Sequence, residues 1–476
     1  MNWEYLISLD IGSIHNYIFG TNRLREIRGA SSLLNKLNSE IPLNEIKSGK
    51  YGNENKDWRY LIAGGGNIKV LFSDESKAEE YKNFLTESFR KEAPGTKIAI
   101  ILSKRNGESE QQWLKRSEKE LQIAKYARHE KGQIVTNGFF KVCQACGLYP
   151  AEYEDLRPEG MRYICKTCDL KVNESRNYVT TELYKRLTKE IGFTPEFPSE
   201  FNEIGQVSDP EGYIGFIYAD GNRMGEYLAN KINSFDALAS FSNDIKEATF
   251  DATVTAIKTH FGDKFIPIQM ILSGGDDLIL ALPAHKAMDI AIDFCEEFNS
   301  RLKSRGISTS ASIVICHDSL PIKNVLNAAD SLLKNAKAES RKKDGGSFID
   351  FIVVTGSALE DPVSKRKREL ERNDIGTHNI TKRPYSIDDF KKLIDAIREF
   401  QLSDFPNNKL KALYTYLFKG HYQSILDACY IKTRLKDEHK GLINKFGLTM
   451  FPWEEVSTLK YTTPFGDIVE LYEFIH

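Results

Sequence analysis

Two stretches of the chain show the same order of apolar strands and amphipathic helices. Each begins with a short apolar strand that ends in an aspartate, Tyr5–Asp10 in the first stretch and Tyr213–Asp220 in the second. A long helical segment, two strands joined by a glycine-rich turn, a further helix and a last strand follow in both. The last strands are expected at Lys97–Leu102 and Ser308–Cys316. The pattern therefore predicts two βαββαβ units.

The two units align under a single shift of 210 residues. This shift places Asp10 on Asp220 and the turn Gly64–Asn67 on the turn Gly274–Asp277. Matching order, turn and spacing favour a duplication over coincidence. We expect each unit to be a ferredoxin-like half, which is an antiparallel sheet with helices on one face.

Three acids of the second unit are expected to meet at one edge of its sheet. Asp220 ends the first strand, and Asp276 and Asp277 occupy the tight turn between the two central strands. Clustered carboxylates repel each other unless cations lie between them, and carboxylate oxygens suit Mg²⁺ or Mn²⁺. Gly274 and Gly275 leave room in the turn for a triphosphate. The pattern indicates metal-assisted phosphoryl or nucleotidyl transfer.

A glycine-rich segment follows Asp220 and offers backbone N–H groups to phosphate oxygens. Gly221, Asn222 and Gly225 stand at the expected start of a helix, where anions bind readily. We therefore assign these three residues to the nucleotide site.

The first unit differs from the second in its turn. It has Gly66 and Asn67 where the second unit has two acids, so we expect its metals to be lost. Its turn is either a simple tight turn or a backbone platform for a second nucleotide. Asp10 either serves only the fold or keeps a lone ligand role.

Four cysteines lie between the two units in two C-x2-C pairs. Cys143 and Cys146 are followed, after eighteen residues, by Cys165 and Cys168. This is zinc-ribbon spacing, and four thiolates fill the tetrahedral coordination of a structural Zn²⁺. The alternative is a pair of redox dithiols, which no thioredoxin-like pattern supports. The remaining cysteines, in apolar surroundings, are expected in the core: Cys295, Cys316 and Cys429.

The C-terminal part shows helical spacing of its apolar residues. Ser386–Phe400 is expected to be a helix with Ser386 as its N-cap, and residues 408–435 show the same pattern. Lys365–Asn379 is charged and lacks apolar periodicity, which is typical of a linker. We expect a helical packing or interaction domain after it.

Composition narrows the class of protein. The chain has 476 residues, 41% of them hydrophobic, and 65 basic against 67 acidic side chains. A chain of this size has several domains, and its near-zero net charge excludes a globally basic nucleic-acid binder. No apolar run is long enough for a membrane span, and the first residues lack the basic start of a signal peptide. We expect a cytoplasmic protein that makes no use of a membrane.

Several of these segments together resemble the large subunit of type III CRISPR effector complexes. The match is most specific to its second palm domain, a relative of GGDEF cyclases and polymerase palms. The cysteine pairs lie where that family carries a cysteine-rich insert, and the resemblance covers about residues 1–355. It rests on Tyr218–Gly225, Leu272–Leu278, Thr309–Val314 and Ala328–Lys337 in the second unit, and on Asp10–Phe19 and Leu24–Leu33 in the first.

The resemblance implies an enzyme that makes cyclic oligoadenylate, a second messenger of antiviral defence, from ATP. One ATP would lie on the metal-bearing palm and another on the degenerate palm. By carry-over, Asp220 and Asp276 bind the catalytic Mg²⁺ or Mn²⁺ and Asp277 supports or completes that site. Lys337 neutralises the triphosphate, and Arg341 is a weaker candidate for the same role.

Two departures from the family pattern change the expectation. Many large subunits have a second aspartate where this chain has Asn222, so one metal ligand is weakened or replaced by water. Larger members begin with an HD nuclease domain, whereas this sequence starts at the first palm, so we expect a form without that domain and no DNA cleavage.

The expected organisation is an α+β protein with two ferredoxin-like palm domains flanking a zinc ribbon. The predicted parts are a degenerate first palm at 1–135, the zinc ribbon at 136–175, the second palm with its GGDD turn at 176–360 and the helical domain at 380–476. The expected partners are a nucleoside triphosphate, RNA and effector-complex subunits. Two alternatives stay open: a catalytically silent nucleotide-binding scaffold, and a GTP-using dinucleotide cyclase.

Overall fold

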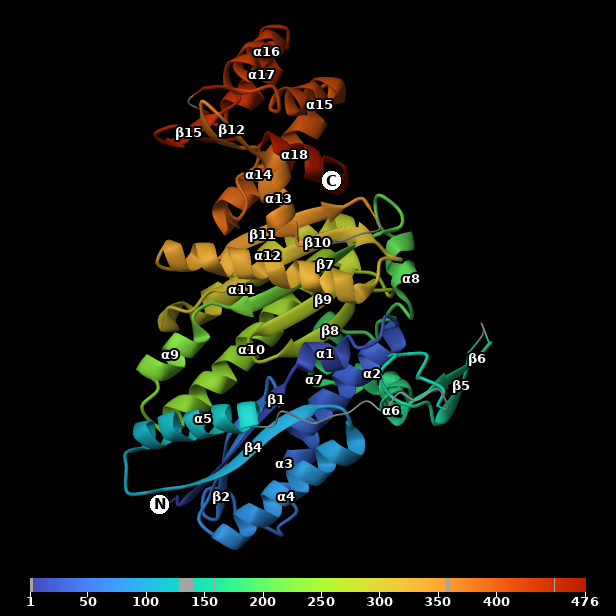
Figure 1. Ribbon diagram of the computed structural model, residues 1–476, viewed down its shortest axis with the longest axis vertical. Coiled ribbons are helices and arrows are strands. Elements are labelled where there is room, and N and C mark those ends of the chain that lie inside the picture. Colours follow the sequence, from blue (N-terminus) through green and yellow to red (C-terminus); the bar gives the residue numbers. More distant parts are fainter. Residues whose placement is uncertain (1–2, 128–139, 158–159, 357–359, 449) are drawn as a thin grey trace.

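The first unit is an antiparallel four-stranded sheet at one end of the molecule (Figure 1). The computed structural model describes residues 3–127, 140–157, 160–356, 360–448 and 450–476. The sheet has the order β2-β3-β1-β4, so the first strand lies in the middle with the central hairpin on one side. Its strands are β1 (Tyr5–Gly12), β2 (Trp58–Gly64), β3 (Asn67–Phe72) and β4 (Lys97–Lys104).

The second unit repeats this arrangement and extends it. Its inner strands follow the order β8-β9-β7-β10, which matches β2-β3-β1-β4 strand for strand. Two further strands complete a six-stranded sheet, because β11 pairs parallel with β10 and β14 pairs with β11. The bounds are β7 (Tyr213–Gly221), β8 (Gln269–Gly274), β9 (Asp277–Pro283), β10 (Thr309–His317), β11 (Phe348–Val354) and β14 (Tyr385–Ser386). The α+β fold with two βαββαβ units is confirmed.

Helices cover both faces of each sheet. Within each βαββαβ unit the helices lie on one face, as predicted, and the helix after the last strand covers the other face. Successive residues of β7 point to opposite faces of the sheet. Ile217 packs in the core beneath α10 and α11, and Phe216 packs in the core beneath α12. The helices are α1 (Ile14–Ile18), α2 (Leu24–Asn35), the π-helix η1 (Lys36–Glu40), α3 (Ile41–Ile46), α4 (Glu75–Glu92) and α5 (Glu110–Ala127) in the first unit. The second has α9 (Met224–Lys231), α10 (Phe235–His260), the 3-10 turns η3 (Ala284–Lys286) and η4 (Lys303–Arg305), α11 (Ala287–Leu302) and α12 (Ile322–Lys342).

The two units contact each other through large side chains. Trp113 of α5 and Phe235 of α10 meet edge to face with ring centroids 5.7 Å apart. Buried Arg28 of α2 donates from Nε to Oε1 of Gln269 in β8 at 2.6 Å. Each unit therefore supplies helices to the other, and the two sheets are held in a fixed relation.

A cysteine module, residues 140–157 and 160–175, docks against α2 of the first unit (Figure 1). Its hairpin is β5 (Tyr153–Arg157) and β6 (Gly160–Ile164), followed by α6 (Lys166–Glu174), η2 (Ser175–Thr180), α7 (Glu182–Ile191) and α8 (Phe201–Gln206). Fully buried Glu26 of α2 pairs with Arg157 and Arg162 of the hairpin at 3.1 and 2.5 Å. Charges so deeply buried must be paired, so these contacts fix the module in place.

The C-terminal domain is mixed, which corrects the expectation of a helical one. A four-stranded sheet of order β12-β13-β16-β15 accompanies its helices. The segment expected to be a linker contains part of α13 together with β12 and β13. The elements are α13 (Pro362–Leu370), β12 (Glu371–Asp374), β13 (Gly376–Asn379), α14 (Ile387–Leu402), α15 (Asn407–Tyr416), α16 (His421–Thr433), α17 (Asp437–Asn444), β15 (Glu454–Ser457), β16 (Lys460–Thr462), α18 (Phe465–Leu471) and η5 (Tyr472–Phe474). Strands this short and polar leave no periodic signal in the sequence.

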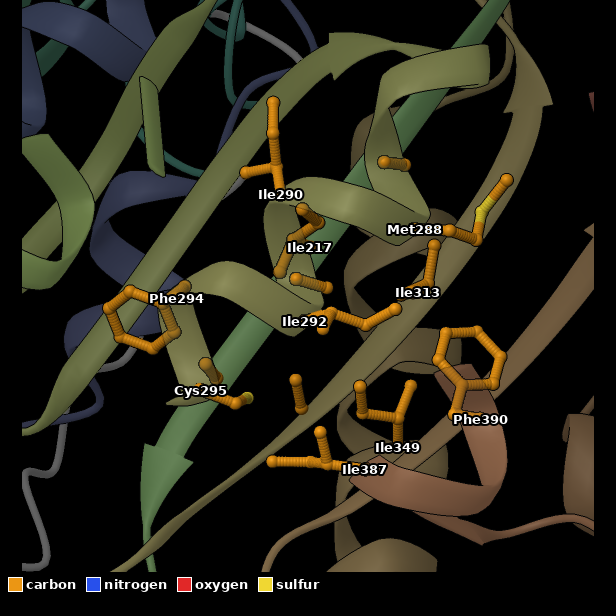
Figure 2. Close-up of a cluster of buried hydrophobic side chains, with 14 of the residues drawn as sticks. Ile217, Met288, Ile290, Ile292, Phe294, Cys295, Ile313, Ile349, Ile387 and Phe390 are labelled. Carbon is orange, nitrogen blue, oxygen red and sulfur yellow. The ribbon is translucent and has the colours of Figure 1, made fainter. Parts of the chain in front are cut away.

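The second sheet and the C-terminal domain share one core. Figure 2 shows side chains of α11, such as Ile292, beside Ile349 of β11 and Phe390 of α14. Ser386 caps α14 as predicted, since its hydroxyl accepts from the N–H of Asp389. Cys295 is buried here, whereas Cys429 is exposed, which corrects its expected place in the core. Within the described ranges, no helix has both the length and the apolarity that crossing a bilayer requires.

Candidate functional site

Three aspartates of the second unit gather where its sheet faces the first unit. Asp220 lies at the end of β7, and the β8–β9 turn carries Asp276 and Asp277. Register brings them together, because Ala219 pairs with Leu278 and the next positions along are Asp220 and Asp277. Asp276 reaches the same point, since Cβ of a side chain at Gly221 would lie only 2.9 Å from its Oδ2.

Burial and mutual repulsion act on these carboxyl groups. Burial first, and then the neighbouring Asp220 carboxylate, raises the pKa of Asp276 to about 8. The same causes, with Asp276 adding to them, raise the pKa of Asp277 well above its ordinary value. Lys337 of α12 opposes both increases and forms an ion pair with Asp220. Asp276 and Asp277 hold their protons although Lys337 is near, so the three carboxyl groups have less positive charge around them than they need to ionise together.

The glycines of the turn meet the corresponding turn of the first unit. The nearest heavy atom to a Cβ added at Gly65 would be Cα of Gly275, at 3.2 Å. Gly65 and Gly275 both have positive φ, at 59° and 63°, which glycine adopts without strain. The two turns therefore touch through bare backbone, and a Cβ at Gly65 would require the facing backbone to shift by a few tenths of an ångström.

The loop after Asp220 is arranged differently from the expectation for Asn222. The backbone N–H of Asn222 donates to the carbonyl of Ser308 at 2.8 Å, and its side-chain amide donates to Ser308 Oγ and to the carbonyl of Gly346. Its Oδ1 is buried without a partner. Asn222 thus ties its loop to the segments just before β10 and β11, and its backbone N–H is already used and cannot donate to a phosphate.

The start of α9 is more open. Gly225 lies in its first turn with nothing within 4 Å of an added Cβ, and α9 has no fully buried residue. The guanidinium of Arg223 donates to the carbonyl of Arg341 at 3.1 Å, while the side chain of Arg341 is exposed. The structure therefore places Gly225 at the end of the loop that follows Asp220, but it gives Arg341 no defined place in the site.

A hollow of about 360 Å³ lies beside Asp277 and is lined mainly by the first unit. This volume is in the usual range for a small-molecule site. Nε2 of His15 lies 3.3 Å from the hydroxyl of Tyr218, and the two rings meet edge to face. Burial lowers the pKa of His15 against the opposing effect of Asp330 and Asp220, so the imidazole is neutral at pH 7. The lining residues are Ile11, Ser13, Ile14, His15, Asn16 and Asp277.

The first unit has an aspartate–lysine ion pair like that of the second unit but lacks the two turn acids. Lys125 of α5 forms an ion pair with Asp10, as Lys337 of α12 does with Asp220. Asp10 faces Asn67 across β1 and β3, where the second unit has two acids. Lys125 and His15 were not predicted from the sequence. The 210-residue shift places Lys125 within two residues of Lys337. Lys125 could therefore have been predicted from the duplication.

The four cysteines of the module form one cluster. Their sulfur atoms all lie within 4.8 Å of one another, and the Sγ atoms of Cys146 and Cys165 are 3.9 Å apart. Four sulfurs at about 2.3 Å from a tetrahedral zinc ion are roughly 3.8 Å apart, so the spacing fits this metal. Cys165 precedes α6 and Cys168 lies in its first turn, which places half of the ligands on one helix.

The region that carries the acid site is similar to a known protein family. Residues 213–345 match the family model described as Cas10/Cmr2, second palm domain. The CRISPR system Cmr subunit Cmr2 of Pyrococcus furiosus is 23% identical over 235 residues, which is 41% of this chain and 26% of that protein. The matched region thus spans about a quarter of the length of the curated relative.

Solved structures share the fold over nearly the whole chain. The Csm1-Csm4 cassette in complex with cA3 has a TM-score of 0.63 at 16% identity and covers all of this chain and 70% of the solved one. The cassette in complex with AMPPNP has a TM-score of 0.61 at 15% identity with the same coverage. The cassette with cA4 has a TM-score of 0.59 and covers 92% of this chain and 65% of the solved one.

The matched region contains every polar group of the acid site. Asp220, the Gly274–Asp277 turn and Lys337 all fall within residues 213–345. The resemblance drawn from the sequence is confirmed: residues 213–345 match the family model of the Cas10/Cmr2 second palm domain, and the chain is similar in sequence to Cmr2 and in fold to the Csm1-Csm4 cassette.

Proposed function

We propose that this protein is a metal-dependent nucleotidyltransferase that joins ATP into cyclic oligoadenylates as a signal in antiviral defence. The observation that carries the proposal is the acid cluster beside the hollow between the two palms. Burial and repulsion hold protons on Asp276 and Asp277, and a cation would displace those protons. Such clustering lowers the stability of the folded protein when no cation is bound. Groups with strongly shifted pKa values of this kind are typical of catalytic sites.

Asp220, Asp276 and Asp277 would hold Mg²⁺ or Mn²⁺. Carboxylate oxygens are the ligands that both ions prefer, and the glycines around them leave open space for phosphate oxygens. When bound, the metal supplies positive charge for the attacking oxygen and the departing pyrophosphate. The side-chain amide of Asn222 donates to Ser308 and Gly346, and this residue adds no carboxylate to the set.

The reaction would form one phosphodiester at a time. The 3′-oxygen of one nucleotide bonds to the α-phosphorus of an ATP, and the bond from that phosphorus to the pyrophosphate oxygen breaks. Pyrophosphate leaves with the electron pair, and the hydroxyl proton passes to solvent. The same step within a linear product closes the ring.

Side chains of both palms would hold the two nucleotides. Lys337 would exchange its carboxylate partner Asp220 for the triphosphate once a cation occupies the acids. The hollow would receive the second nucleoside against Ser13, His15 and Asn16, which offer hydroxyl, imidazole and amide groups. The degenerate palm would thus bind a nucleotide without binding metal.

The nucleotides bound in similar solved structures support ATP as the substrate. Csm1-Csm4 cassettes have been solved in complex with one ATP, with pppApA and pppApApA, and with cA3 and cA4. By analogy, ATP is the favoured substrate here, and other subunits of an RNA-guided effector complex are the favoured partners.

The test uses the purified chain, alone and with a Csm4-type subunit and target RNA. It is incubated with α-labelled ATP or GTP and Mg²⁺ or Mn²⁺, and the products are separated. Wild type should convert ATP to new phosphodiesters, and the Asp276→Ala, Asp277→Ala double variant should not. Asp263→Ala, an exposed acid outside the site, is the matched control and should keep full activity.

Three results would overturn the proposal in different ways. Undiminished product from the double variant would remove the acids from the chemistry. ATP binding without product under every condition would favour the silent scaffold. Product from GTP alone would favour a dinucleotide cyclase.

A further inference from the structure

A buried lysine of the cysteine module reaches into the first palm. Lys171 lies on α6 one turn beyond Cys168, and its side chain is 3% exposed. Its ammonium donates to the carbonyl of Tyr17 in α1 and lies 4.0 Å from the centroid of the Tyr17 ring. A lysine is rarely so deeply buried, and the acceptor of this one belongs to another domain.

The acceptor is a helix-end carbonyl. Helix α1 has only five residues, Ile14–Ile18, so most of its carbonyls lack an intrahelical donor. A helix this short is not stable by itself and depends on contacts from outside. A cation at the C-terminal end also complements the helix dipole. Lys171 therefore acts as a cap supplied by another domain.

The backbones of α2 and α6 cross too closely for Lys171 to move aside. A Cβ added at Gly29 of α2 would lie 1.7 Å from the carbonyl oxygen of Lys171. Glu174 at the end of α6 pairs with Lys36 and accepts from Ser32, both on the first palm. The position of Lys171 is thus set by the packing of α6, whose start carries Cys165 and Cys168.

The other end of α1 faces the hollow. Ser13, with φ at 59°, precedes α1, and His15 and Asn16 lie within it. His15 is tied to Tyr218, which lies two residues before Asp220 on β7. A displacement of α1 would therefore move three lining residues of the hollow together.

We propose that Lys171 is a positioning residue that fixes α1, and through it the nucleotide-facing residues Ser13, His15 and Asn16, from the cysteine module. The module would then do more than stabilise itself, because a metal ion held by Cys165 and Cys168 would fix the start of the helix that carries Lys171. The inference rests on the proposed function only for the ligand in the hollow. The mechanical link from α6 to α1 stands on the contacts alone.

The test compares Lys171→Met with Lys166→Met. Methionine keeps the length of the side chain and removes the ammonium, and Lys166 is an exposed lysine on the same helix. Amide hydrogen exchange of residues 13–20, zinc content and ATP affinity in the presence of Mg²⁺ are measured for both. Lys171→Met should exchange at least about tenfold faster in this segment, the effect of losing a hydrogen bond to a charged group.

The same variant should bind ATP about tenfold more weakly and raise KM for ATP with kcat unchanged, while its zinc content equals that of wild type. Lys166→Met should match wild type in every readout. If Lys171→Met does not fold, Lys171→Gln, which keeps an N–H donor, replaces it and should show a smaller effect in the same direction.

Unchanged exchange of residues 13–20 would overturn the inference, as would loss of zinc from the Lys171 variant. Failure of wild type to bind ATP is a different result. It would contradict the proposed function, while the exchange measurement would still decide the role of Lys171.

Discussion

Replacing Asp276 by asparagine should stabilise the metal-free protein at alkaline pH. An aspartate whose pKa in the folded state lies above its unfolded value contributes stability that is complete below the unfolded pKa and is lost as the pH rises through the folded pKa. For Asp276 the unfolded pKa is 3.8 and the folded pKa is about 8. Metal-free wild type should therefore lose stability between about pH 4 and pH 8, and Asp276→Asn should lose less.

The magnitude follows from the difference in pKa. A difference of about four, at about 1.4 kcal/mol for each tenfold change in proton affinity, corresponds to roughly 6 kcal/mol. Asp276 is partly exposed, and solvent screening reduces this figure, so about 3 kcal/mol is the expected gain for Asp276→Asn at pH 8. For a domain of this size that gain raises Tm by about 6 to 12 °C.

The assay is thermal unfolding at pH 5 and pH 8, with EDTA or with Mg²⁺, for wild type, Asp276→Asn and the control Asp263→Asn. Mg²⁺ should raise Tm of wild type, most at pH 8 where protons compete least, and should have a much smaller effect on Asp276→Asn. Asp263→Asn, which changes an exposed acid, should follow wild type. The reasoning is refuted if Asp276→Asn melts at or below wild type in EDTA at pH 8, or if Mg²⁺ stabilises both proteins equally.

Three further predictions concern the surroundings of this site. Gly65→Ala should weaken ATP binding because its Cβ meets Gly275. Gly107→Ala, also at a positive φ but with no atom within 4 Å of the added Cβ, should leave ATP affinity unchanged. Isothermal titration measures both affinities, and equal values would contradict the turn contact. Glu26→Ala should lower the free energy of unfolding by about 1.5 to 3 kcal/mol, because Arg157 and Arg162 lose one of the two carboxylates they share and keep only Asp155; a loss below about 0.5 kcal/mol in denaturant unfolding would contradict that pairing. Cys168→Ser should reduce zinc from one ion per chain toward none and lower Tm; metal analysis that finds no zinc in wild type would rule out the zinc site.

Much of the second palm could be predicted from the sequence because its signals are local. The strand that ends in Asp220 and the hairpin turn around Asp276 are each defined by a few consecutive residues, and antiparallel pairing then brings them together. The duplication reinforced this prediction by showing the same order twice. The spacing of the two cysteine pairs is local in the same sense.

The parts that escaped prediction depend on contacts between distant segments. His15 reaches Tyr218 only because the two palms dock through contacts such as Trp113 with Phe235, which no periodicity reveals. Strands β12 and β13 are short and polar, and β13 is stabilised by its pairing with β16 from the end of the chain. Asn222 follows an acid in a glycine-rich loop, yet tertiary hydrogen bonds to Ser308 and Gly346 give it a structural place.

The most direct test of the central claim is mass spectrometry of the nucleotides formed by the purified protein from ATP and Mg²⁺ or Mn²⁺, alone and with a Csm4-type subunit and target RNA. The account predicts masses of cyclic or linear oligoadenylates together with pyrophosphate from wild type, and unreacted ATP from the double variant Asp276→Ala, Asp277→Ala. Unreacted ATP from wild type under all these conditions, or oligoadenylates from the double variant, would contradict it.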